Sequence, residues 1–199
     1  MPTIIDNGKA PTVVLVHGAF ADGSSWNGVI ERLQAEGVAV TAPANPLRGV
    51  SIDSAYLAGV FEETQGPVLA VSHSYGGVVV TNAATQAKNV VPAKFREAVA
   101  ADLPAEQTAL MAATQRPLAE LAFSEPTGAP AWKGLPSWTI VATGDKAAGA
   151  DVIRSMAERA GSTITELDGS HVIMISQPDA VAEVILKALS AVGSVAAAA

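Results

Sequence analysis

Residues 71 to 77 read Val-Ser-His-Ser-Tyr-Gly-Gly, and an apolar run stands on each side of them. This order predicts a strand, a sharp turn with Ser74 at its apex, and a helix. Such a turn is a nucleophile elbow, small-x-Ser-x-Gly, which presents a serine hydroxyl above a parallel sheet. The backbone doubles back there, so only small residues fit two positions before and after the serine. Here these are Ser72, where glycine is usual, and Gly76.

A second element of the same chemistry is expected upstream of the elbow. The β-branched run Thr12–Val16 predicts a strand, and His17-Gly18-Ala19-Phe20 follows it directly. The backbone N–H of Ala19, together with the N–H of Tyr75, would form a two-donor oxyanion hole above the serine. An ordinary strand-to-loop turn is the alternative for this stretch, and the nearby elbow favours the oxyanion hole. Phe20 is then expected to contact substrate.

A serine nucleophile needs a base, and the chain has three histidines. His17 ends a predicted strand, and His73 is next to the serine, with its side chain expected to point away. His171 follows the alternating run Thr163–Leu167 and a short turn, so it lies on a loop after a strand. A general base must occupy such a loop to reach a serine above the sheet. His171 is therefore the predicted base.

The base needs an acidic partner that fixes its tautomer and stabilises the imidazolium. Asp145 follows the predicted strand Ser137–Thr143, and the resulting order along the chain, serine, aspartate, histidine, is typical of α/β hydrolases. Two other carboxylates compete for this role. Asp151 is expected to cap a helix over residues 152–160, and Asp168 is in the turn three residues before His171. We favour Asp145 and keep Asp151 as the alternative.

With these residues in place, the chain resembles the α/β-hydrolase superfamily, and in particular the small esterase branch that includes plant methyl esterases and hydroxynitrile lyases. The resemblance covers most of residues 12–88 and 137–188. It implies a Ser74–His171–Asp145 triad, no cofactor, and hydrolysis of esters or related acyl groups. We expect no metal site, and cleavage of a small, fairly apolar carboxylic ester through an acyl-enzyme intermediate. A lyase or perhydrolase using the same triad, or a non-catalytic ligand-binding member of the fold, is the alternative.

The middle of the chain departs from this family. A further strand is expected after the helix that follows the nucleophile, but only Asn89-Val90-Val91 stands before Pro92. An unfilled gap would leave buried N–H and C=O groups without partners, at about 1–3 kcal/mol each. We therefore expect the sheet to close, with Ser137–Thr143 pairing directly with Val68–Ser72.

A small helical cap is predicted over residues 92–134, in a single α/β-hydrolase domain of residues 1–199. Proline breaks divide this segment into helices near 93–102, 105–115 and 117–123. Phe123 and Trp132 lie in it and are candidate substrate contacts, as is Trp26 near the oxyanion loop. For all three, packing in the core is the competing interpretation.

The composition agrees with a mostly parallel, doubly wound sheet with helices on both faces. The chain has 199 residues, 49% of them hydrophobic, with a net charge of −7 and no cysteine. This charge argues against nucleic acid as a partner, and the absence of cysteine excludes disulfides and thiolate metal sites. No signal-peptide pattern and no long apolar run is seen, so we expect a cytoplasmic protein with no membrane partner. A homodimer is left open.

Overall fold

The computed structural model describes residues 10–81, 92–116, 118, 121–126 and 133–197. Their strands form two parallel sheets. The first has the order β2-β1-β3, and the second is the pair β4-β5. The strands are β1 (Thr12–Val16), β2 (Val40–Thr41), β3 (Val68–Ser72), β4 (Trp138–Ala142) and β5 (Thr163–Leu167).

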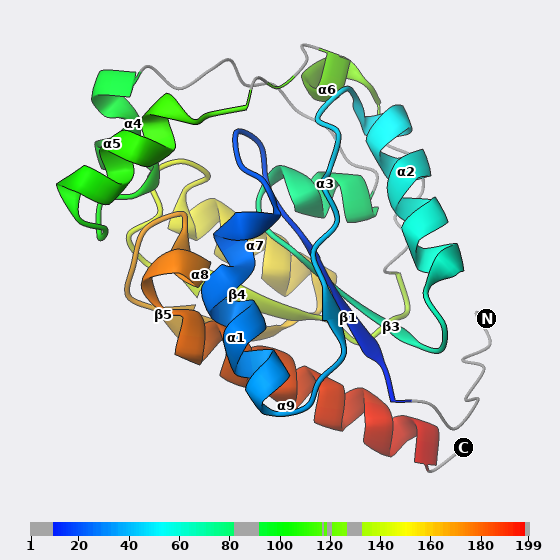
Figure 1. The fold of residues 1–199 in the computed structure, drawn as a ribbon. Helices are drawn as coiled ribbons and strands as arrows, with labels where there is room; N and C mark the ends of the chain where they lie inside the picture. The colour runs from blue at the N-terminus through cyan, green and yellow to red at the C-terminus, as the bar shows by residue number, and fades with distance from the viewer. Residues whose placement is uncertain (1–9, 82–91, 117, 119–120, 127–132, 198–199) are drawn as a thin grey trace.

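Helices surround both sheets (Figure 1). They are the 3-10 helix η1 (Gly23–Trp26), α1 (Asn27–Ala35), α2 (Val50–Glu63), α3 (Tyr75–Thr81), α4 (Pro92–Val99), α5 (Ala105–Ala113), α6 (Leu121–Ser124), α7 (Ala150–Ala160), α8 (Ile173–Ser176) and α9 (Pro178–Ala197). Helices α4 to α6 fall in the segment expected to form the cap, although α6 is shorter than predicted. None of the described helices has the length and apolar character needed to cross a membrane.

Strand β1 is buried on both faces, as its unbroken apolar sequence predicts. Successive side chains of a strand point to opposite faces. Val13 and Leu15 accordingly pack in a cluster with residues of α1 and α9, while Val14 and Val16 pack with residues of α2 and α3. The prediction of a parallel sheet covered by helices on both faces is confirmed.

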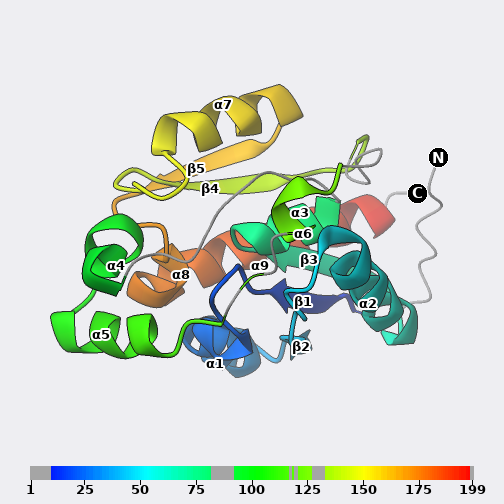
Figure 2. The ribbon, with the colours of Figure 1, turned by 90° about the horizontal axis from the view of Figure 1, so that it is seen from above.

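The expectation that Ser137–Thr143 pairs directly with Val68–Ser72 is wrong. Among the described strands, β3 pairs only with β1, and β4 only with β5. Figure 2 shows β4 and β5 set apart from β1 and β3, with α7 next to β4 and β5. The expectation assumed that the unpaired edge of β3 would be buried. Ala70 and Ser72 are exposed, so the described part of the chain does not enclose β3 as the expectation assumed. The stub at residues 89–91 lies outside the described residues.

Candidate active site

Ser74 occupies a strained turn between β3 and α3. Its φ of 52° lies in the left-handed region, which residues other than glycine seldom adopt. The turn is closed by two backbone hydrogen bonds, from Gly76 N–H to His73 O and from Gly77 N–H to Ser74 O, each 2.9 Å long. A Cβ added at Gly76 would lie 2.7 Å from His17 O and closer still to Val16 O. Glycine is therefore required two residues after the serine, as the elbow motif predicts.

The loop after β1 lies against this turn. A Cβ added at Gly18 would come within 2.9 Å of His73 Nδ1 and 3.0 Å of Ser74 Cβ. The N–H groups of Ala19 and Tyr75, the predicted oxyanion donors, have no acceptor among the described residues. The hydrogen bonds of the described residues thus leave both groups unengaged, as the predicted oxyanion hole requires.

Tyr75 is held in place by a buried carboxylate. Its hydroxyl donates to Asp53 Oδ2 at 2.7 Å, and the other oxygen of Asp53 accepts the Arg48 N–H at 3.0 Å. The side chain of Asp53 is fully buried. Burial, followed by the hydrogen bond to Asp53, raises the pKa of Tyr75. The residue that carries one predicted oxyanion donor is thus anchored from α2.

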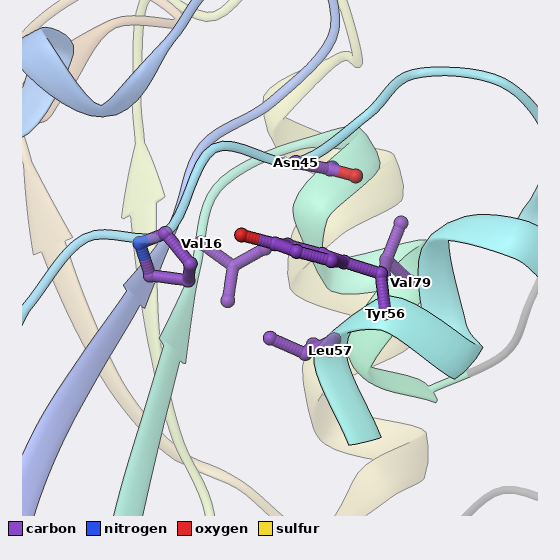
Figure 3. Close-up of a pocket in the computed structure, with 6 residues that line it drawn as sticks. Val16, Asn45, Tyr56, Leu57 and Val79 are labelled. Atoms are coloured by element: carbon purple, nitrogen blue, oxygen red, sulfur yellow. The ribbon is translucent and has the colours of Figure 1, made fainter. Parts of the chain in front are cut away.

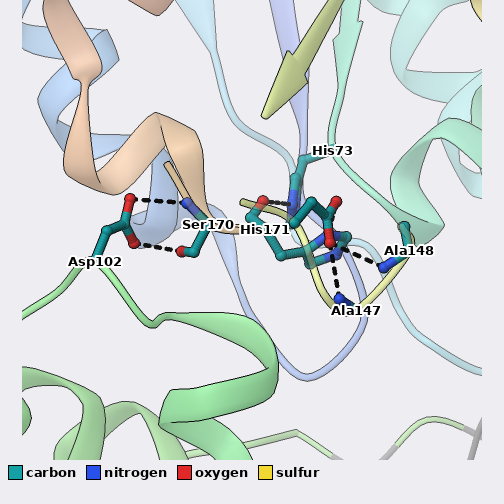
Figure 4. Close-up of polar contacts among 7 residues, drawn as sticks. His73, Asp102, Ala147, Ala148, Ser170 and His171 are labelled. Atoms are coloured by element: carbon teal, nitrogen blue, oxygen red, sulfur yellow. Dashed lines mark hydrogen bonds and ion pairs between the residues drawn. The ribbon is translucent and has the colours of Figure 1, made fainter. Parts of the chain in front are cut away.

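His171 and Asp145 are in direct contact. His171 Nδ1 lies 2.8 Å from Asp145 Oδ2, and the two side chains are only 13% and 8% exposed. The other oxygen of Asp145 accepts the N–H groups of Ala147 and Ala148 at 2.8 and 2.9 Å (Figure 4). Burial alone would raise the pKa of Asp145, but the hydrogen bonds and the charge of His171 outweigh it and lower the pKa to about 2. The carboxylate is therefore ionised at neutral pH.

The two competing carboxylates lie elsewhere. Asp151 is almost fully exposed and forms an ion pair with Arg154. It does not cap α7, which begins at Ala150 after Gly149, so the expected capping role is wrong. Asp168 accepts a hydrogen bond from the Thr143 hydroxyl at 3.3 Å. Of these described carboxylates, Asp145 alone contacts His171.

His73 does not point away from the site, in contrast to the expectation. Its Nε2 donates to the backbone oxygen of His171 at 2.9 Å, and the centres of the two rings are 4.7 Å apart. Burial, with a smaller contribution from His171, lowers the pKa of His73 to about 3. A neutral His73 thus connects the loop of the nucleophile to the loop of the predicted base.

The hydroxyl of Ser74 has no hydrogen-bond partner among the described residues, so its bond to His171 is not formed here. Ser74 itself is exposed. Catalytic hydrogen bonds of free enzymes are often long and tighten only when substrate binds. The arrangement therefore brings together the acid and the base, and places the nucleophile loop beside them through His73.

The predicted substrate contacts have different environments. Phe20 is half-buried with a φ of 63°, and its oxygen accepts the Arg116 N–H at 3.2 Å. Trp26 is 3% exposed and packs in the main hydrophobic cluster, which agrees with the competing interpretation of core packing. The side chain of Phe123 and all of Trp132 lie outside the described part of the chain.

A small hollow of about 150 Å³, including the space at its mouth, lies on the side of β1 that faces α2 and α3 (Figure 3). It is lined by Val16, Pro43, Asn45, Tyr56, Leu57 and Val79. No member of the predicted triad lines it, and its walls are largely apolar. It is therefore separate from the candidate active site.

Sequence reasoning missed two residues that support this site. The contact of Asp53 with Tyr75 spans 22 residues, and that of His73 with His171 spans 98. No local pattern identifies the partner of Asp53. For His73, its position beside the nucleophile was the available indication.

The fold and the strand-turn-helix around Ser74 define a class of parallel α/β proteins in which the functional loops follow the carboxyl ends of the strands. Residues 13–101 and 87–184 match the model of the alpha/beta hydrolase family. The chain belongs to this family. A search of curated protein sequences finds no match.

Three solved structures illustrate the similarity. A pyrethroid hydrolase from Sphingobium faniae JZ-2 shares 18% identity, with a TM-score of 0.72 over 92% of this chain and 98% of that one. A methylesterase from Arabidopsis shares 19%, with a TM-score of 0.77 over 90% and 99%. Polyneuridine aldehyde esterase shares 17%, with a TM-score of 0.75 over 90% and 99%. At these identities the similarity establishes the fold.

Proposed function

We propose that this protein is a serine hydrolase that cleaves a small, fairly apolar carboxylic ester through an acyl-enzyme intermediate. The observation that carries the proposal is the 2.8 Å contact between His171 Nδ1 and Asp145 Oδ2. This contact lies on the loops after β5 and β4, and His73 joins it to the elbow that bears Ser74. Similarity in fold to esterases supports the same reaction class.

In the proposed reaction, the Ser74 hydroxyl attacks the acyl carbon of the ester. Because Nδ1 of His171 faces Asp145, Nε2 takes the serine proton and then passes it to the leaving alcohol. Water activated by His171 then attacks the acyl-enzyme, which releases the acid and restores Ser74. Asp145 remains ionised and stabilises the imidazolium formed in each step.

The N–H groups of Ala19 and Tyr75 would stabilise the tetrahedral intermediate. Neither N–H has an acceptor among the described residues, so both can bind the oxyanion without breaking an existing bond. A preorganised donor of this kind contributes about 3–4 kcal/mol to transition-state stabilisation. The anchoring of Tyr75 by Asp53 supplies the rigidity that such a donor requires.

Two alternative functions are compatible with the same fold. A lyase or perhydrolase would employ the same triad, and product analysis separates these reactions from ester hydrolysis. A binding-only role would follow if the altered sheet displaced Asp145 from His171. The close contact of these two residues argues against that role.

The proposal is tested with a panel of p-nitrophenyl esters of increasing acyl length. The wild type is expected to release p-nitrophenol, with the highest kcat/KM for short to medium acyl chains. Ser74→Ala should retain at most a few per cent of this activity. Ser72→Ala, which alters the other serine of the elbow strand, is the matched control and should remain active. Substantial activity of Ser74→Ala would contradict the proposal.

A further inference from the structure

Within the part of the chain that the structure describes, no strand pairing connects the loop that carries His171 to the strand before Ser74. Among the described strands, β5 pairs with β4, and neither pairs with β3, which precedes Ser74. In an unbroken sheet, ladder hydrogen bonds would set the distance between these loops. Here other contacts must fix the position of the base loop, residues 168–171, relative to Ser74.

The α/β core supplies several such contacts, among them those of His171 with Asp145 and of Asp168 with the Thr143 hydroxyl. The N–H of Gly144 donates to Gly169 O at 2.9 Å and joins the base loop to the loop of Asp145. Nε2 of His73 donates to His171 O at 2.9 Å and joins the base loop to the elbow. Each of these contacts uses only one hydrogen bond.

A further contact comes from the turn between α4 and α5, and it uses both oxygens of one carboxylate. Asp102 Oδ2 accepts the Ser170 N–H at 2.9 Å, and Asp102 Oδ1 accepts the Ser170 hydroxyl (Figure 4). Ser170 is 3% exposed and directly precedes His171. A Cβ at Gly169 would lie 2.8 Å from Asp102 Oδ2, so the absence of a side chain there admits the carboxylate.

The turn that presents Asp102 is itself firmly packed. Ala100 and Leu103 are 0% and 5% exposed and belong to the same hydrophobic cluster as Val172 and Ile173, which follow the base. Asp102 is exposed as a residue; its partial burial alone would raise the pKa, but the hydrogen bonds from Ser170 outweigh this and lower the pKa. Asp102 is therefore an ionised acceptor on a turn whose neighbouring residues are packed in the core.

We propose that Asp102 is a positioning residue that holds the base loop so that His171 faces Ser74, and that the α4–α5 segment thereby controls the geometry of the triad. This inference rests on the proposed hydrolase function. Asp102 contacts Ser170 rather than the reacting atoms, so it acts through the position of His171. Its loss should affect the chemical step more than substrate binding.

The decisive comparison is between Asp102→Ala and Asp168→Ala. Both variants remove one carboxylate, but Asp102 binds Ser170 from outside the base loop, whereas Asp168 belongs to this loop and contacts the Thr143 hydroxyl. Asp102→Ala should lower kcat about 10- to 100-fold with little change in KM, because small displacements of a catalytic group cost rates of this order. Asp168→Ala leaves the two hydrogen bonds between Asp102 and Ser170 in place and should therefore cost clearly less kcat than Asp102→Ala.

A conservative variant separates positioning from folding. In Asp102→Asn, the amide oxygen can still accept the Ser170 N–H, and the amide NH₂ can donate to the Ser170 hydroxyl. This variant should recover most of kcat. If Asp102→Ala fails to fold by circular dichroism, Ser170→Ala, which removes only the hydroxyl contact, replaces it and should lower kcat several-fold.

A readout independent of turnover is histidine-selective NMR, which is simple for a chain with three histidines. The ring signals of His171 and His73 should shift or broaden in Asp102→Ala, while His17 serves as the internal reference. Unchanged histidine spectra with unchanged kcat would overturn the inference, as would equal losses in the two aspartate variants. If the wild type hydrolyses no ester but the His171 signal still depends on Asp102, the proposed reaction fails and the positioning role stands.

Discussion

The most demanding test of the elbow is Gly76→Ala. The added methyl group would lie 2.7 Å from His17 O and closer still to Val16 O, whereas real Cβ contacts stay beyond 3.0 Å. Both obstacles are backbone atoms of β1 and the oxyanion loop, so no flexible side chain can move aside. Either β1 or the turn that carries Ser74 must shift by roughly half an ångström, as expected when a packed core is overfilled.

Overpacking of this kind costs about 1–3 kcal/mol, and we expect the upper part of that range because the contacts are with backbone. For a chain of this size, each kcal/mol lowers Tm by about 2–4 °C. Gly76→Ala should therefore lower Tm by about 4–12 °C. Because Ser74 moves with the turn, kcat should fall about 100-fold, as expected for a misplaced catalytic group.

Gly59→Ala is the matched control, measured by thermal and urea unfolding under the same conditions. Gly59 lies inside α2, and a Cβ there meets no atom within 4 Å. This substitution should stabilise the protein by about 0.5–1 kcal/mol through helix propensity. A Gly76→Ala variant that melts like the wild type and keeps full activity would refute the elbow geometry.

Three further predictions concern the surroundings of the site. Asp145→Asn should lower kcat by about 10³- to 10⁴-fold with little change in KM, whereas Asp151→Asn should leave steady-state turnover unchanged. Tyr75→Phe should lower the free energy of unfolding in urea by about 1–3 kcal/mol, because buried Asp53 loses a donor. His73→Gln should make the free energy of unfolding less dependent on pH below neutrality. With the pKa of His73 lowered from 6.5 to about 3, the unfolded wild type binds a proton that the folded protein does not, so stability falls as pH drops below about 6.5.

Different results would contradict each prediction. A larger loss of turnover in Asp151→Asn than in Asp145→Asn would reassign the acid. A Tyr75→Phe variant as stable as the wild type would mean that Asp53 is not buried as described. Parallel stability profiles of His73→Gln and the wild type between about pH 7 and pH 4 would show that His73 titrates normally when folded.

The local parts of this structure could be predicted from the sequence because local chemistry determines them. The small residue two positions after Ser74 was expected from the tight turn, and the space at Gly76 shows why. The alternating run Thr163–Leu167 is found as β5 with the same bounds, since a period of two suits only a strand.

The parts that could not be predicted depend on contacts between distant segments. The pairing of Ser137–Thr143 with Val68–Ser72 was inferred from the cost of a buried edge, but whether that edge is enclosed is a property of the whole fold. Likewise, Asp102 is 68 residues from Ser170, and nothing in its own turn marks it as a partner of the base loop.

Labelling with a fluorophosphonate probe, followed by peptide mapping, tests the central claim most directly. The account predicts one covalent adduct per chain on the Ser74 hydroxyl, much slower labelling of His171→Ala, and none of Ser74→Ala. Failure of the folded wild type to react, or an adduct on a different serine, would contradict the assignment of Ser74 as an activated nucleophile.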